Sequence, residues 1–229
     1  MSSFDPVAKS YSQQVDKAVS FSGFGFEYFV QRKVEHLKSF VRNHFDGMIE
    51  NRSSLDIGAG EGQYSLGLQS LGFKATLTDV SPEFLKEAQK KSGIGDCVVA
   101  DASNLPFPDA SRDVIVLAMV LHHIPVEKWQ AVFAECHRVL KTNGLVAIYE
   151  HNPWNPLTRR VMASLPFDAD ANPRPLPAMK KYVEKAGFEI LLQEYLFFVP
   201  GVLKFFCPLE RFLTWCPAGA QYALIMRKG

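Results

Sequence analysis

The hydrophobic and polar positions of this chain follow two alternating patterns. Short apolar runs are followed by segments in which apolar residues recur every three to four positions. The first pattern is typical of buried strands and the second of amphipathic helices. The predicted strands are 53–58, 74–80, 96–101, 112–121, 144–151, 188–198 and 221–228, and the predicted helices are 63–72, 84–93, 126–140 and 178–187.

The order of these elements predicts the fold class. Strands alternate with helices from residue 53 onward, which is typical of a doubly wound α/β fold with a mostly parallel sheet. The run 112–121 is apolar on both faces, as expected of a central parallel strand. In such sheets, ligands bind beyond the carboxyl ends of the strands.

Acidic residues end the first three predicted strands. Asp56, Asp79 and Asp101 each follow or close an apolar run. Because the carboxyl ends of parallel strands meet at one edge of the sheet, we expect the three carboxylates on one rim. This rim suits a ligand that offers ammonium, hydroxyl and amino groups.

The stretch LDIGAGEGQ (55–63) narrows the choice of ligand. Gly58, Gly60 and Gly62 permit a tight turn and a close approach of the backbone to a ligand. The dinucleotide fingerprint G-x-G-x-x-G, counted from Gly58, needs a glycine where this chain has a glutamine. The carboxylate of Asp56 would also repel the pyrophosphate that such loops hold at a helix N-terminus.

S-adenosylmethionine fits this pattern because it carries an ammonium, a carboxylate and a sulfonium but no phosphate. The glycine loop offers backbone amides to its carboxylate. Asp56 can serve the ammonium, directly or through water, and Asp79 can accept from both ribose hydroxyls. Asp101 can accept from the adenine amino group while the Ala102 amide meets the ring. We therefore expect S-adenosyl-L-methionine as cofactor and S-adenosyl-L-homocysteine as its product.

The chain resembles the Rossmann-like (class I) S-adenosylmethionine-dependent methyltransferases, and within them the methyltransferase type 11 and ubiquinone/menaquinone methyltransferase-like group. The matching stretches are LDIGAGEGQYS, LTDVSPEFLKEAQ, ADASNLPFPDASRDVIVLAMVLHHI and HRVLKTNGLVAIYEHNP, which cover most of 53–153. One departure is KTNG, where the family more often has a proline–glycine turn. We expect Asn143 and Gly144 to form a turn of their own.

The resemblance implies seven strands, with the last, 221–228, antiparallel and inserted beside the sixth. It also implies that Tyr11 lies on a helix covering the cofactor, and that Ala118 and Met119 lie against its methionyl part and sulfonium. The full expected cofactor-binding set is Asp56, Gly58, Ala59, Gly60, Gly62, Asp79, Val80, Asp101, Ala102, Ala118, Met119 and Tyr11.

We expect one domain whose N-terminal helices and insertions form a cap over the cofactor and enclose a small, partly apolar acceptor. Candidate walls of the acceptor pocket are Tyr11, Phe21, Phe24, Trp154 and Phe197, each equally compatible with core packing. The expected parts of domain 1–229 are a helical leader and lid at 1–50, a cofactor-binding half at 53–150, and a substrate-side half at 151–229 with insertions at 151–177 and 199–218.

His123 and His151 are candidate catalytic bases because they follow the fourth and fifth strands. A histidine in such a place can equally fix the local turn. A base matters most for a hydroxyl acceptor, and the residues do not distinguish an oxygen, nitrogen or carbon nucleophile. The stretch EHNPWNPLTRRV resembles a subgroup often linked to glycan or secondary-metabolite pathways.

The charge composition of the chain bears on which partners it can bind. The chain has 25 Lys and Arg against 24 Asp and Glu, so its net charge of +1 gives no field that would gather nucleic acid or an anionic membrane. The run 114–121 is too short to cross a bilayer, and the first residues lack a signal-peptide pattern. We expect a cytoplasmic protein with a small-molecule substrate, no nucleic-acid partner and no membrane insertion.

Four cysteines without a C-x-x-C pair predict free thiols and no structural zinc, so no metal site is expected. The expected function is methyl transfer from S-adenosylmethionine to a small molecule. Two other classes stay open at this stage. One is a non-catalytic methyltransferase-like scaffold or regulatory domain. The other is an NAD-dependent oxidoreductase, which the missing glycine and Asp56 disfavour.

Overall fold

The computed structural model describes residues 4–229, so the first three residues of the predicted leader lie outside the described part. Within it, seven strands form one sheet in the order β3-β2-β1-β4-β5-β7-β6. The strands are β1 (Ser53–Ile57), β2 (Lys74–Asp79), β3 (Cys97–Val99), β4 (Arg112–Ala118), β5 (Leu140–His151), β6 (Phe188–Leu196) and β7 (Gln221–Lys228).

The sheet is mostly parallel. The pairs β1–β2, β1–β4, β2–β3 and β4–β5 run parallel, and β7 runs antiparallel to both β5 and β6. The predicted fold class is therefore confirmed, including the antiparallel last strand beside the sixth. The order reverses at β1, from which the chain continues outward to β2 and β3 and later returns to β4 on the other side.

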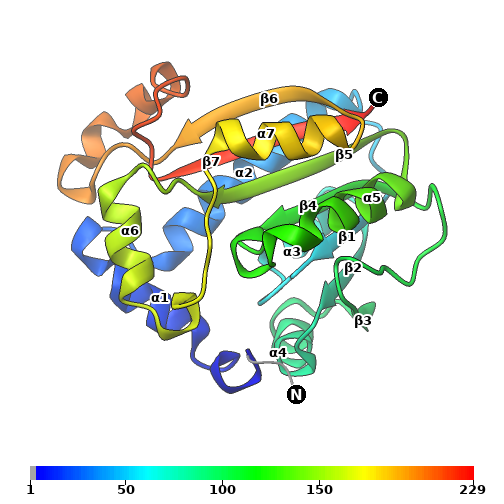
Figure 1. Ribbon diagram of the computed structural model, residues 1–229, viewed down its shortest axis with the longest axis horizontal. Helices are drawn as coiled ribbons and strands as arrows, with labels where there is room; N and C mark the ends of the chain where they lie inside the picture. Colours follow the sequence, from blue (N-terminus) through cyan, green and yellow to red (C-terminus); the bar gives the residue numbers. More distant parts are fainter. Residues whose placement is uncertain (1–3) are drawn as a thin grey trace.

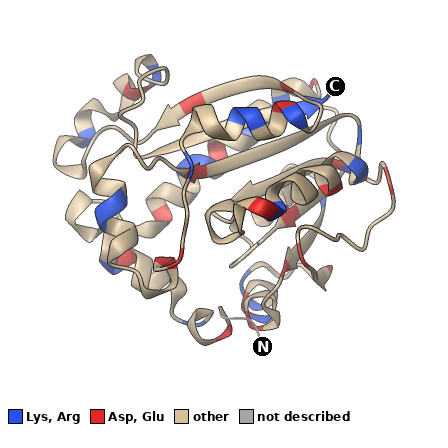
Figure 2. Ribbon diagram, viewed as in Figure 1, with Lys and Arg blue, Asp and Glu red and all other residues tan. Residues whose placement is uncertain are grey.

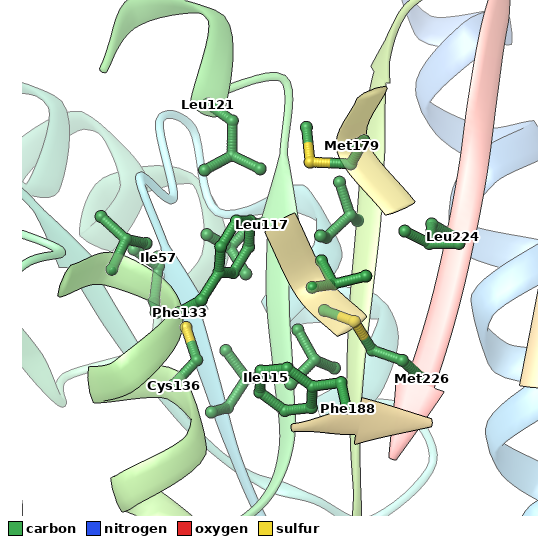
Figure 3. Close-up of a cluster of buried hydrophobic side chains, with 14 of the residues drawn as sticks. Ile57, Ile115, Leu117, Leu121, Phe133, Cys136, Met179, Phe188, Leu224 and Met226 are labelled. Carbon is green, nitrogen blue, oxygen red and sulfur yellow. The ribbon is translucent and has the colours of Figure 1, made fainter. Parts of the chain in front are cut away.

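Helices cover both faces of the sheet (Figure 1). Both faces of the sheet need cover because the side chains of the central strand β4 alternate between two buried clusters. Val114 and Val116 belong to the cluster with α2 and α3, whereas Ile115 and Leu117 belong to the cluster with α5 and α7 shown in Figure 3. The helices packed on the sheet are α2 (Phe26–His44), α3 (Gln63–Gln69), α4 (Pro82–Ser92), α5 (Trp129–Val139) and α7 (Leu176–Lys185).

The leader and the two insertions gather at one end of the sheet, on the left of Figure 1. The leader contributes short helices that the hydrophobic pattern did not delimit, and each insertion contains helical turns in place of an irregular loop. These elements are η1 (Asp5–Val7), α1 (Tyr11–Val19), η2 (Ser20–Ser22), α6 (Pro156–Ala163), η5 (Pro166–Asp168) and η6 (Gly201–Phe212).

Two predicted boundaries are wrong. The fifth strand begins at Leu140, earlier than predicted, because it already pairs with Arg112 there. The expected turn at Asn143 and Gly144 falls inside β5, where Asn143 has a φ of 61° and the register shifts before Leu145. The fourth strand ends at Ala118 because Met119 has a φ of 59°. The chain then continues through η3 (Leu121–His123) and η4 (Val126–Lys128) into α5.

Charged side chains are interspersed over the elements, with basic and acidic residues close to one another in Figure 2. Among the residues that the structure describes, none of the helices combines the length and apolar character that crossing a membrane requires. All four cysteines have free thiols.

Candidate functional site

The loop between β1 and α3 turns through three glycines with positive φ. A Cβ on Gly58, whose φ is +66°, would collide with the Val120 side chain, so only glycine fits there. Gly60 has a φ of +52° and open space around it. The turn is closed by hydrogen bonds from Ala59 N to Thr78 O (2.9 Å) and from Gly62 N to Ala59 O (2.8 Å). The loop is thus rigid, and its open side can accept a ligand.

Asp79 at the end of β2 faces this loop. Its Oδ2 accepts a hydrogen bond from Gly60 N (3.2 Å) and its Oδ1 accepts one from Ser81 N (2.8 Å). Burial raises the pKa of this carboxyl, and the hydrogen bonds partly oppose that shift. The backbone therefore fixes the orientation of a carboxylate that also lines a cavity.

Asp101 follows β3 and is exposed. Its Oδ1 accepts hydrogen bonds from Ser103 N (2.8 Å) and Oγ (2.7 Å), and its Oδ2 lies 3.3 Å from Lys128 Nζ. These hydrogen bonds from Ser103, followed by the contact with Lys128, lower the pKa of Asp101. An ionised acid therefore stands at this part of the rim, beside the half-exposed Val80.

Asp56 takes a different place from the one expected. It is 2% exposed and does not line the cavity. Its Oδ2 accepts hydrogen bonds from Ser65 N (3.2 Å) and Oγ (3.0 Å), so the carboxylate supports the first turn of α3. Burial raises the pKa of Asp56 to about 7, against the effect of Ser65. This geometry does not support a direct contact with a ligand, and Glu61 is the acid of the loop that lines the cavity.

The cavity over the loop has a volume of about 270 Å³. It is lined by all the predicted cofactor-binding residues except Asp56 and Gly62. A Cβ on Gly62 would lie 2.9 Å from Leu77, so this glycine serves the packing of α3 on the sheet. The predicted residues that line the cavity are Tyr11, Gly58, Ala59, Gly60, Asp79, Val80, Asp101, Ala102, Ala118 and Met119.

A second cavity, also of about 270 Å³, lies under the leader and the two insertions. Phe21, Phe24 and Phe197 line it as predicted, together with Tyr11. The prediction for Trp154 is wrong, because its side chain is 53% exposed and is not part of the wall. The two cavities share five lining residues, which are Tyr11, Phe26, Val30, Lys33 and Met119.

Glu150, at the end of β5, organises the loop after β4. Its Oε1 accepts hydrogen bonds from Val120 N (3.0 Å) and Leu121 N (2.7 Å). Its Oε2 lies 2.6 Å from Nδ1 of His122. Burial alone would lower the pKa of His122, but Glu150 and then Asp168 outweigh it and raise this pKa. The sequence analysis predicted a catalytic base in this loop but selected the neighbouring His123.

The two predicted bases face different cavities. His151 lines the second cavity, and its buried Nδ1 has no hydrogen-bond partner within residues 4–229. His123 lines the cavity over the glycine loop, with its ring 4.9 Å from that of Phe4. Burial lowers the pKa of both, to about 3 for His123, so both imidazoles are neutral at neutral pH. His122 also lines the second cavity, which adds a candidate base.

Two further polar residues were missed. Asp168 on η5 is 7% exposed and lines the second cavity, and burial raises its pKa to about 6. Lys33 on α2 is 3% exposed and lines both cavities, and burial lowers its pKa to about 7. The signal for Lys33 is its place on the buried stripe of α2 between Val30 and Leu37, where a lysine is unusual.

The strand order, the glycine loop after β1 and the acids after β2 and β3 define a Rossmann-like methyltransferase fold of class I. Residues 55–148 match the family model described as "Methyltransferase domain". The match covers less than half of the chain and agrees with the family resemblance inferred from the sequence motifs.

Curated relatives match about half of the chain. A demethylmenaquinone methyltransferase of Thermotoga maritima is 35% identical over 108 residues, which are 46% of this chain and 45% of that protein. A sterol 24-C-methyltransferase of Eremothecium gossypii is 32% identical over 120 residues, 48% of this chain and 31% of that protein. The matches thus span less than half the length of these relatives.

Solved structures share the fold over the whole chain. A methyltransferase of Thermotoga maritima described as a possible histamine N-methyltransferase superposes with a TM-score of 0.69 at 16% identity. The superposition covers 99% of this chain and 98% of that one. At this identity the likeness establishes the fold.

Proposed function

We propose that this protein transfers a methyl group from S-adenosylmethionine to a small, partly apolar acceptor. The observation that carries the proposal is the pair of cavities with a shared wall. One is lined by the glycine loop and the strand-end acids, and the other by aromatic residues of the leader and insertions. Because the two cavities share lining residues, ligands bound in them would lie next to each other, as a direct transfer requires.

The first cavity fits S-adenosylmethionine. The open space at Gly60 admits the methionyl part, and Asp79 offers a fixed carboxylate to the ribose hydroxyls. Asp101, Ala102 and Val80 form the part of the rim suited to adenine. The bound cofactor would supply an electrophilic methyl group and a thioether leaving group.

The shared wall performs the alignment on which an in-line displacement depends. Met119 is held in its left-handed conformation by a hydrogen bond from its amide to Tyr149 O (2.8 Å). Tyr11 packs edge-on against Phe26 and Phe84, which ties the leader to the cofactor side. Correct alignment of two bound reactants can lower a barrier by about 7–11 kcal/mol.

The second cavity indicates the chemistry of the acceptor. Most of its lining is aromatic or aliphatic, and its ionisable side chains include Lys33, His122, His151 and Asp168. An acceptor with an apolar body and one polar end matches this division. The demethylmenaquinone and sterol enzymes among the relatives are named for apolar acceptors, which supports the same class.

A base would contribute where the acceptor is a hydroxyl. His122 is oriented by Glu150, which favours proton uptake by its imidazole. His151 has an unpartnered Nδ1, but burial lowers its pKa and makes it the weaker base. Such a base contributes about 10²–10⁴-fold in rate. A nitrogen or carbon acceptor would depend more on alignment alone.

Ligand binding and turnover test the proposal. We expect S-adenosylhomocysteine to stabilise the protein against heat, by about 2–4 kcal/mol at large excess, and NAD to leave it unchanged. Acceptors are then screened with methyl-labelled S-adenosylmethionine. A stabilisation by NAD and none by either adenosyl ligand would contradict the proposal. Binding without turnover on any quinol, sterol or phenol would instead favour a methyltransferase-like scaffold. The cytoplasmic location stays a prediction.

A further inference from the structure

Three side-chain atoms face one another where the two cavities meet. They are Nε2 of His122, Nε2 of His123 and Oδ1 of Asp168. The Asp168 oxygen lies 3.4 Å from the His123 nitrogen and 3.9 Å from the His122 nitrogen. All three atoms lie within 4.8 Å of one another.

The three side chains are withdrawn from solvent and held from outside the cluster. The side chains of His122 and Asp168 are each 3% exposed, and that of His123 is 15% exposed. Glu150 fixes the ring of His122 through Nδ1, which leaves Nε2 directed at Asp168. A hydrogen bond from Asn172 N to His122 O (2.8 Å) ties the segment that carries Asp168 to η3.

We propose that His122, His123 and Asp168 bind a divalent transition-metal ion. Two imidazoles and one carboxylate suit Zn²⁺, Co²⁺, Fe²⁺ or Mn²⁺. Metal–ligand bonds of about 2.1 Å place two ligands at a tetrahedral angle roughly 3.4 Å apart. The two separations from Asp168 Oδ1, 3.4 Å to His123 and 3.9 Å to His122, are close to this value. Small rotations of the side chains bring all three atoms to one ion.

The contact between His122 and Glu150 has the form of an outer-shell contact in a metal site. A histidine ligand usually donates its other ring N–H to a carboxylate, which sets the tautomer and the ring orientation. Here Oε2 of Glu150 lies 2.6 Å from Nδ1 of His122, while Nε2 points to the proposed ion. In the neutral tautomer that donates Nδ1–H to Glu150, Nε2 carries the lone pair that a metal requires.

The position of the ion follows from the cavities. His122 and Asp168 line the second cavity and His123 lines the first, so the ion lies at their boundary. Three protein ligands leave at least one coordination position open. On the proposed function, that position would hold an oxygen of the acceptor beside the methyl donor, and this part of the inference rests on that function.

The cysteine spacing gave no hint of this site because no cysteine contributes to it. Two ligands are adjacent in the chain and the third comes from a separate insertion. Only the fold brings them together.

Metal binding is measured directly on the full-length, tag-free protein. The probes are CoCl₂, followed by its visible absorption, and ZnCl₂, followed by calorimetry and by elemental analysis after dialysis. We expect one equivalent to bind in the micromolar range or tighter. The variants are His122→Ala, Asp168→Asn and Glu150→Gln, with Asp170→Asn as a matched control because Asp170 is exposed on the same segment.

His122→Ala and Asp168→Asn should each weaken binding at least tenfold. Glu150→Gln should weaken it about 10–100-fold with all three ligands present, and Asp170→Asn should not change it. Asp168→Asn keeps the shape of the side chain, so metal binding by this variant tests the proposal if His122→Ala does not fold. No binding by the wild type, or binding unchanged in the ligand variants, overturns the proposal. S-adenosylhomocysteine binding to the same samples shows separately whether the proposed function fails.

Discussion

Gly23 and Gly201 lie against each other where the leader meets the second insertion. A Cβ on Gly201 would lie 2.6 Å from the carbonyl carbon and oxygen of Gly23, closer than real Cβ contacts allow. The two backbones can approach only because residue 201 has no side chain. This contact joins the leader to the segment that carries Phe197 and Pro200, two of the residues that line the second cavity.

Gly201→Ala should therefore loosen the cap. We expect a loss of about 1–3 kcal/mol in the free energy of unfolding, as for other overpacked sites, and faster proteolysis in the leader. Denaturant titration and limited trypsin digestion measure these effects. Gly95→Ala is the control because a Cβ there meets open space. Equal stability and equal cleavage of the two variants would show that the contact does not hold the cap.

Asp79→Asn should weaken the binding of S-adenosylhomocysteine at least about tenfold. The amide keeps the shape of the side chain but removes the charge that strengthens hydrogen bonds to ligand hydroxyls, which is worth roughly 1.5–3 kcal/mol. Calorimetry gives the dissociation constant, and the melting temperature without ligand reports the fold. Glu127→Ala, an exposed acid outside the cavity lining, is the control. Unchanged affinity in Asp79→Asn would rule out its role at the ribose.

Lys33→Met should stabilise the protein more at pH 6 than at pH 9. The folded-state pKa of Lys33 is about 7, below the ordinary 10.5, because burial disfavours its charge. The energetic cost of that burial is fully present below pH 7 and falls as the pH rises toward 10.5. Urea titrations of both proteins at the two pH values give the difference. A gain that is the same at both pH values contradicts a buried, unpaired ammonium.

Phe24→Ala and Trp154→Ala should affect activity differently. Phe24 lines the second cavity, whereas Trp154 is half exposed outside it. With an acceptor found in the screen, Phe24→Ala should raise the acceptor KM at least several-fold and leave the cofactor dissociation constant unchanged. Trp154→Ala should change neither. Equal kinetic effects of the two changes would show that the acceptor binds elsewhere.

The cofactor side of the site could be predicted because its residues are local in the sequence. Gly58 and Gly60 occur in one loop, and Asp79 and Asp101 each end a strand that the hydrophobic pattern delimits. Asp56 was expected to serve the ligand directly or through water, but a strand-end acid can point to either side of the sheet edge. Its hydrogen bonds to Ser65 turn it toward α3.

The acceptor side was harder to predict because it forms from distant segments. His122 and His123 are neighbours in sequence, yet they face different cavities once Glu150 fixes the loop. Trp154 and Phe197 are both aromatic residues in or next to an insertion, and only tertiary packing leaves Trp154 exposed and places Phe197 in the cavity wall. Lys33 shows the opposite case, since its place on a buried helical stripe was readable from the chain.

The shared wall of the two cavities has a consequence for how the substrate range of this protein can change. Replacing Phe21 or Phe24 by a smaller residue changes the fit of the acceptor only, because these residues line the second cavity and not the first. Any replacement at Phe26, Val30 or Met119 alters the fit of both ligands at once. Mutations at Phe21 or Phe24 can therefore change the acceptor that is bound without weakening cofactor binding. A mutation in the shared wall is tolerated only if both the cofactor and the acceptor still bind.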